Sequence, residues 1–163
     1  MKTLLFTLCL TITVLLGSEG ASFSADYQKG LAAARSGNYA TALREFRALA
    51  EQGHASAQYN LGLMYDNGRG VTQDYKESAK WYRKSVEQGH AEAQYNLGVL
   101  YGNGNGVRQD NVYAHMWFDI VASNGDANGA VNRDIVVKRM TKEQLEEAQQ
   151  LARECVLKKY KGC

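Results

Sequence analysis

The chain carries little excess charge and few long apolar runs. Its 163 residues include 19 Lys and Arg against 17 Asp and Glu, so the formal net charge is only +2. That excess is too small to argue for a nucleic-acid partner. No segment after the first apolar run is long enough to cross a membrane. The basic tail, formed by Lys158, Lys159 and Lys161, is interpreted as a solvated end rather than a membrane-binding patch.

The sequence also lacks the common motifs of catalytic and metal-binding sites. The sequence has no CxxC pair, no HExxH helix and nothing that resembles a Ser/His/Asp arrangement. Asp66, Asp74 and Asp110 are expected to be loop or cap residues. We therefore predict no catalytic residue, no metal site and no cofactor.

The first residues are typical of a signal peptide. Lys2 gives a basic start, and Leu4 to Leu16 form an apolar run that is too short for a comfortable membrane span. Small residues follow, and cleavage after Gly20 or Ser22 would place small residues at the specificity positions. We assign residues 1–22 to a signal peptide, and we expect a periplasmic or secreted protein. An uncleaved membrane anchor is the alternative.

Removal of the signal peptide would leave two cysteines, Cys155 and Cys163. An exported chain meets an oxidising compartment, so this pair predicts a disulfide, with two free thiols as the alternative. A continuous helix would separate the two Cα atoms by about 12 Å, whereas a disulfide allows less than about 7 Å. The chain must therefore turn after Lys158, and Gly162 makes that turn easier.

Residues 51–86 and 87–122 are two copies of one repeat. About half of the paired positions are identical. Within each copy the apolar positions recur at three- and four-residue steps, which indicates a helix, and a second helix follows. Such a unit cannot bury its apolar face alone, so units stack on one another. The repeat therefore indicates a stacked scaffold first and an enzyme only second.

Glycine marks two places in each copy. Gly62 and Gly98 lie in the middle of the first predicted helix, where glycine costs about 1 kcal/mol, so we expect another helix to cross there at close range. Spaced glycines also fill the loops 67–71 and 103–107. No strand precedes these loops and no lysine–hydroxyl pair follows them, so nucleotide binding is a weak interpretation. We expect loops that need positive φ, each with a valine against the core.

Shorter units flank the two copies. Residues 26–50 form a unit in front, and residues 123–140 form a worn capping unit behind, in which Arg133 and Asp134 replace the Leu-Gly pair of the copies. Thr141 and Gln144 predict a capping box for a final helix that ends near Lys158. Residues 23–163 are thus expected to form one repeat domain: an all-α, right-handed α-solenoid of about eight helices with no strands.

The two copies resemble the Sel-one-like repeat (SLR) family, a branch of the tetratricopeptide-like superfamily. The shared pattern is Ala-x3-Leu-Gly-x2-Tyr, then a Gly-x-Gly-Val loop, then a second helix that carries an aromatic pair. The matching residues are Ala57, Leu61, Gly62, Tyr65, Gly68, Gly70, Val71, Ala79, Trp81 and Tyr82, and then Ala93, Leu97, Gly98, Tyr101, Gly104, Gly106, Val107, Trp117 and Phe118.

The resemblance implies adaptor or scaffold work in macromolecular assembly. His115 departs from the pattern, since the family has alanine there, and this suggests a loosened last interface. A cysteine-rich subset of the family has been linked to β-lactam binding or hydrolysis. That subset carries a cysteine pair in each repeat, which this chain lacks, so the activity is not carried over.

In tetratricopeptide-like stacks the first helices line a concave groove. The residues two positions before the helix glycines carry side-chain amides: Gln28, Asn60 and Asn96. Asn132 extends this column at the same period. The residues just before them form a column of tyrosines: Tyr27, Tyr59 and Tyr95. These side chains could bind an extended peptide, or the asparagines could satisfy backbone groups between repeats. Arg35 faces the same groove and could recognise a carboxylate. The predicted partner-binding residues are Tyr27, Gln28, Arg35, Tyr59, Asn60, Tyr95, Asn96 and Asn132.

His54 and His90 occupy equivalent positions just before a helix. They are expected to be one repeat apart, too far to share a metal ion, and are interpreted as helix-start residues. The leading hypothesis is a monomeric, exported bacterial interaction module that binds a peptide or helix of a partner protein. One alternative is an enzyme that acts on cell-wall or β-lactam substrates. The other is an inhibitor or immunity-type protein for an exported enzyme.

Overall fold

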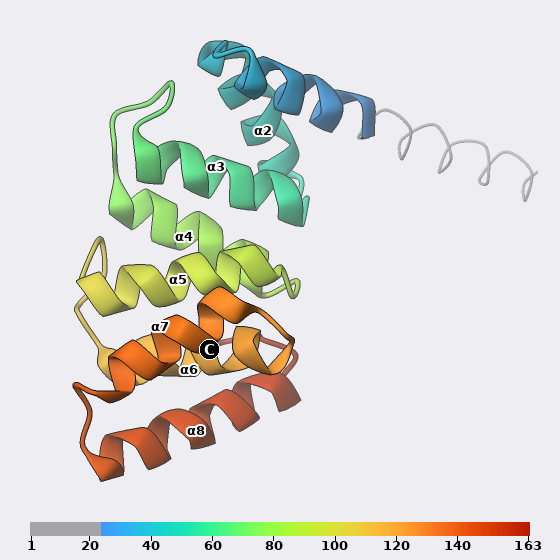
Figure 1. Cartoon of the computed structure of the whole chain (residues 1–163). Helices are drawn as coiled ribbons and strands as arrows, with labels where there is room; N and C mark the ends of the chain where they lie inside the picture. Colours follow the sequence, from blue (N-terminus) through green and yellow to red (C-terminus); the bar gives the residue numbers. More distant parts are fainter. Residues whose placement is uncertain (1–23) are drawn as a thin grey trace, which may run out of the picture.

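The computed structural model describes residues 24–163, and these residues form a stack of helices (Figure 1). The predicted signal peptide, residues 1–22, lies outside the described part. An N-terminal helix spans residues 24–35. The others are α2 (Tyr39–Glu51), α3 (Ala55–Asn67), α4 (Tyr75–Val86), α5 (Ala91–Asn103), α6 (Asn111–Ser123), α7 (Ala127–Val137) and α8 (Lys142–Leu157). No strand occurs between residues 24 and 163, so the prediction of an all-α solenoid of about eight helices is confirmed.

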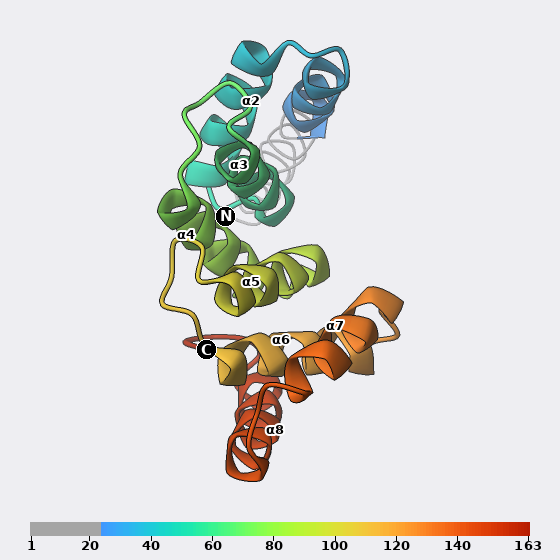
Figure 2. The same ribbon diagram turned by 60° about the vertical axis from the view of Figure 1, so that its left-hand side comes forward.

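The helices alternate between two sides of the stack. Figure 2 shows the N-terminal helix, α3, α5 and α7 on one side, and α2 and α4 on the other. The N-terminal helix and α7 project further than α3 and α5, so the side formed by the first helices is concave. We call this side the concave face. At the end of the stack α6 contacts both α7 and α8.

The mid-helix glycines allow the second helices to approach closely. A Cβ atom on Gly62 would lie 2.6 Å from two ring carbons of Tyr82, and one on Gly98 would lie 2.9 Å from the ring of Phe118. Tyr82 is fully buried and Phe118 nearly so. The predicted close crossing is therefore confirmed in both copies.

Caps and loops follow the repeat as predicted. Asp74 caps α4 through hydrogen bonds from the amides of Lys76 and Glu77, and Asp110 caps α6 in the same way. Thr141 and Gln144 form the capping box of α8. The loop glycines have positive φ, for example +74° at Gly70, where a Cβ atom would lie 2.9 Å from the carbonyl oxygen of Tyr39.

The core is divided along the stack. One cluster of buried residues joins the N-terminal helix, α2, α3 and α4, and it contains Phe46, Leu61 and Trp81. A second joins α4, α5, α6 and α8 around Tyr82 and Trp117. Each cluster is shared by neighbouring units, as stacking of incomplete units requires.

The C-terminal tail folds back onto the second cluster. Cys155 and Cys163 form a disulfide, with their Cα atoms 5.6 Å apart. The turn between them contains Lys159 at φ 51° and Tyr160 at φ 65°, a conformation that costs a non-glycine residue free energy. Tyr160 and Cys163 pack against the cluster around Trp117.

Candidate partner-binding face

The predicted tyrosine and asparagine columns meet across the unit boundaries. Asn60 on α3 donates from Nδ2 to the hydroxyl of Tyr27 on the N-terminal helix at 3.0 Å. Asn132 on α7 donates to the hydroxyl of Tyr95 on α5 at 2.7 Å. Each asparagine thus bonds to the tyrosine of the unit before it. The structure brings the two columns together as pairs between successive first helices.

The histidines at the helix starts complete these contacts. His54 is the N-cap residue of α3, and its ring stacks on Tyr27 with 5.0 Å between the ring centroids. His90 is the N-cap residue of α5 and stacks on Tyr59 at 4.7 Å. The predicted helix-start role is confirmed. The stacking was missed, although tyrosine and histidine recur together at the repeat period.

The middle boundary differs from the other two. Asn96 on α5 donates from Nδ2 to the hydroxyl of Tyr82 at 3.3 Å. Tyr82 in turn donates to Oδ2 of Asp66 at 3.0 Å. Asp66 was predicted to be a loop or cap residue, and this is wrong: it lies in the last turn of α3. The helix continues past it because Gly68, two residues later, supplies the left-handed C-cap.

Burial perturbs the titration of this middle group. It raises the pKa of Asp66, and the hydrogen bond from Tyr82 opposes that change only in part. Burial also raises the pKa of Tyr59, the charge of Glu92 adds to the effect, and a hydrogen bond from Asn96 lowers it. Tyr59, Asn96 and Asp66 are therefore close enough to influence one another.

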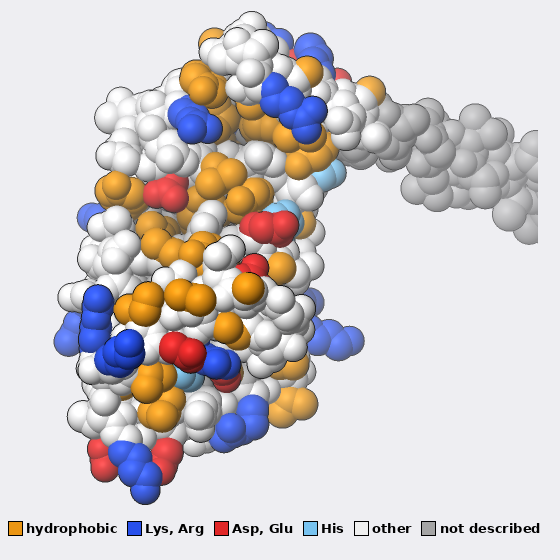
Figure 3. Space-filling model, in the orientation of Figure 1, with side chains coloured by type: hydrophobic (Ala, Val, Ile, Leu, Met, Phe, Trp, Pro, Cys, Tyr) orange, Lys and Arg blue, Asp and Glu red, His pale blue; other side chains and the backbone are white. Residues whose placement is uncertain are grey.

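Gln28 and Arg35 take no part in the tyrosine–asparagine pairs. Both side chains are exposed on the N-terminal helix, and neither has a hydrogen bond or ion pair to another described residue. They are open to solvent, whereas the tyrosines and asparagines are half-buried. Figure 3, which colours tyrosine with the hydrophobic residues, shows side chains of this class running down the concave face between scattered charges.

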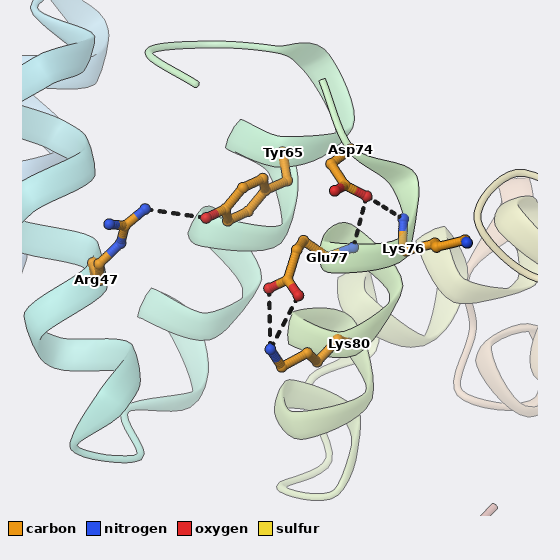
Figure 4. Close-up of polar contacts among 6 residues, drawn as sticks. All are labelled: Arg47, Tyr65, Asp74, Lys76, Glu77 and Lys80. Carbon is orange, nitrogen blue, oxygen red and sulfur yellow. Dashed lines mark hydrogen bonds and ion pairs between the residues drawn. The ribbon is translucent and has the colours of Figure 1, made fainter. Parts of the chain in front are cut away.

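The opposite side of the stack has its own repeated contact. Arg47 on α2 donates to the hydroxyl of Tyr65 on α3 at 3.0 Å (Figure 4). Arg83 makes the same contact with Tyr101, one repeat later, at 3.2 Å. Glu77 on α4 forms an exposed ion pair with Lys80 at 3.1 Å. The two Arg–Tyr contacts link neighbouring helices away from the tyrosine–asparagine pairs, whereas the Glu77–Lys80 pair lies within α4.

His115 lies on α6 and is not among the tyrosine–asparagine pairs of the concave face. It is buried, and its Nδ1 has no hydrogen-bond partner. Burial lowers the pKa of His115, and the nearby Asp119 opposes the shift. Arg133 on α7 pairs with Asp119 at 3.3 Å and with Asp134 at 3.0 Å. Between residues 24 and 163, no group of three or more His, Cys, Asp or Glu residues is placed to hold a metal ion.

Comparison with known proteins identifies the repeat. The family model for the Sel1 repeat matches residues 55–90 and 91–126. The c5321 protein, a protective antigen present in uropathogenic Escherichia coli strains, displays an SLR fold; it is 35% identical, with a TM-score of 0.81 over 88% of this chain. A Sel1 repeat protein from Oxalobacter formigenes is 30% identical, with a TM-score of 0.59 over 71% of this chain.

The two Sel1 repeats and these neighbours support the assignment of the chain to the Sel1-like repeat (SLR) proteins. It spans 32% of the first solved chain and 55% of the second. A comparison with curated proteins finds no match. The Sel1 repeat fold suggests a protein–protein interaction scaffold.

Proposed function

We propose that this protein is an exported bacterial scaffold or adaptor, monomeric in solution, whose concave face binds a peptide segment or helix of a partner protein. The observation that supports this most is the row of half-buried tyrosines and asparagines along successive first helices. Tyrosines offer large, rigid contact area with a polar tip, which suits them to interfaces.

The amide geometry indicates which groups a partner would meet. Both amide hydrogens of Asn60 are used within the protein, because its Nδ2 also donates to the carbonyl oxygen of Ser56 at 2.8 Å. A carbonyl can only accept, so the orientation of this amide is fixed. Its Oδ1 makes no hydrogen bond to a described residue. A partner's backbone N–H group would complete it.

Export is part of the proposal and has separate support. The Cys155–Cys163 disulfide suits an oxidising compartment. In the described residues, no helix is long and apolar enough to span a membrane. We place the mature protein in the periplasm or outside the cell. Nucleic acid is not a partner in this proposal, and no catalytic step is assigned.

Affinity capture from periplasmic extract tests the proposal, with the wild-type protein and two double variants as bait. Gln28→Ala with Arg35→Ala removes exposed groups of the concave face that have no internal contacts. Gln52→Ala with Gln150→Ala is the control, because these exposed amides bond only within their own helices. We expect one partner that the control retains and the first variant binds less tightly.

Amide hydrogen exchange on the captured complex should then show protection of α3 and α5. Protection confined to the second helices would contradict the proposal. Turnover of chromogenic β-lactam or peptidoglycan substrates that a single point mutation abolishes would favour the enzyme alternative instead.

A further inference from the structure

Asp66 is a half-buried carboxylate on α3 that has no cation beside it. Its one hydrogen bond to a described residue comes from the neutral hydroxyl of Tyr82, at 3.0 Å. The other acids that lie between helices have cations: Glu45 is 2.9 Å from Lys29, and Asp119 pairs with Arg133. A carboxylate taken partly out of water without a counter-ion costs free energy. Such a group requires an explanation.

The hydrogen bonds around Tyr82 leave acceptors unused. The single hydroxyl hydrogen of Tyr82 goes to Asp66, so its oxygen accepts from Asn96 and the amide of Asn96 must present Nδ2 to it. The Oδ1 atom of Asn96 therefore remains an acceptor with no bond to a described residue. The phenol oxygen of Tyr82 is thus bonded both to a negative carboxylate and to an amide whose own oxygen is unused.

This group is rigid and occurs once. The ring of Tyr82 is fully buried and lies against Gly62, so its hydroxyl cannot follow a moving carboxylate. One repeat later, the positions of Asp66 and Tyr82 are taken by Gly102 and Phe118, which have no polar side-chain groups. The boundary between α3 and α5 is therefore chemically distinct from the boundary between α5 and α7.

The missing component is a cation with several hydrogen-bond donors. A lysine ammonium or an arginine guanidinium supplies both charge and donors, and it has no acceptor that would repel the two oxygens. The ring of Tyr59, whose hydroxyl is affected by Asn96 and by the charge of Asp66, offers an additional cation–π surface. The exposed Glu92 adds negative potential nearby.

We infer that Asp66, with Asn96 held beside it through the Tyr82 hydroxyl, binds one lysine or arginine side chain of the partner segment. Because the group occurs at one boundary of the stack, it fixes the register in which that segment lies on the concave face. This inference rests on the proposed peptide-binding function and adds the partner's chemistry: a segment with a basic residue at a fixed position.

Selection from a display library of short random peptides tests it, with wild-type protein, Asp66→Asn and Glu77→Gln as separate targets. Asp66→Asn removes the charge and keeps an oxygen that can accept from Tyr82. Glu77→Gln removes the same charge from the outer side of α4 (Figure 4). We expect peptides selected on wild type and on Glu77→Gln to share a basic residue at one position, and those selected on Asp66→Asn to lack it.

Binding isotherms of the strongest peptide complete the test. Replacing its basic residue by glutamine should weaken binding to wild type about tenfold, the effect of one charge-assisted hydrogen bond. The same replacement should change binding to Asp66→Asn less than about twofold. Peptides that protect α3 and α5 from exchange without a shared basic residue overturn the inference and leave the proposed function standing. A library that yields no binder to this face contradicts both.

Discussion

At the scale of single residues, we expect Asp66 on the concave face to reduce the stability of the free protein. Asp66 loses hydration, and the hydroxyl of Tyr82 replaces only part of it. Residues at binding sites often carry such a cost, since selection retains them for binding rather than for stability. The cost can be measured without any knowledge of the partner.

Asp66→Asn should make the free protein more stable near neutral pH, by up to about 1 kcal/mol for a carboxyl that solvent partly screens. Because burial raises the pKa of Asp66, the folded state binds its proton more tightly than the unfolded chain. This contribution favours folding below the ordinary aspartate pKa, about 4, and is lost as pH rises through the raised value.

The advantage of the variant should therefore be largest near pH 7 and should disappear below about pH 4. Urea unfolding of both proteins across this range measures it. A variant that is less stable than wild type at neutral pH would show that the carboxylate stabilises the fold.

Gly62→Ala should destabilise the protein by about 1–3 kcal/mol, net of the gain in helix propensity. Its Cβ atom would lie 2.6 Å from the ring of Tyr82, which cannot retreat because it is buried and bonded to Asp66. Gly102→Ala is the matched control, since its Cβ atom would meet only the Cβ of Ala114 at 3.7 Å. The control should gain about 0.5–1 kcal/mol. Equal melting temperatures for the two variants would contradict this account.

At the scale of elements, the C-terminal tail depends on its disulfide. Tyr160 has a left-handed backbone, yet it packs against the cluster around Trp117. Packing of one half-buried tyrosine must offset that backbone cost, and the closed loop assists by limiting the unfolded chain.

Replacing Cys155 and Cys163 by serine should lower the free energy of unfolding by roughly 2–3 kcal/mol. Reduction of the wild-type protein should have the same effect, with faster amide exchange confined at first to residues after α8. Mass spectrometry of exported, unreduced protein should show the mass lowered by two hydrogens. Alkylation of both thiols in the native exported protein would refute the bond.

The sequence predicts the elements well because their signals are local. Helix caps such as Asp74 and Asp110, the loop glycines and the capping box at Thr141 act through neighbours in the chain. The position of Asp66 was predicted wrongly, because an aspartate next to a glycine-rich loop looks the same in sequence whether it caps the loop or bonds across to Tyr82.

At the scale of the whole molecule, the sequence repeat predicts which residue types meet between units. It does not predict which amide donates a hydrogen bond to which hydroxyl. The recurrence of tyrosine and asparagine indicated a shared face. Which amide hydrogen goes to which hydroxyl depends on how consecutive units pack. The sequence therefore could not show that Asn60 bonds to Tyr27 while Asn96, besides its bond to Tyr59, also donates to Tyr82. The structure therefore gives the asparagines an internal role and leaves the Oδ1 atoms of Asn60 and Asn96 without a hydrogen bond to a described residue.

The double change Asn60→Ala with Asn96→Ala tests these two roles together. It removes the hydrogen bonds from Asn60 to Tyr27 and Ser56 and those from Asn96 to Tyr82 and Tyr59, so the free energy of unfolding should fall by about 2–4 kcal/mol. It also removes two acceptors from the concave face. Affinity for the partner, measured per folded molecule well below the melting temperature, should weaken roughly 5- to 150-fold.

Asn67→Ala provides the control for the stability part of that prediction. Asn67 is also on α3, and its Nδ2 donates to the carbonyl oxygen of Leu63 at 2.9 Å, the same four-residue bond that Asn60 makes to Ser56. It is exposed at the end of the helix, outside the asparagine column. Its replacement should cost about 0.5–1.5 kcal/mol and leave affinity unchanged. If the double variant also keeps full affinity per folded molecule while its melting temperature falls, the asparagines only join the units and the partner binds elsewhere.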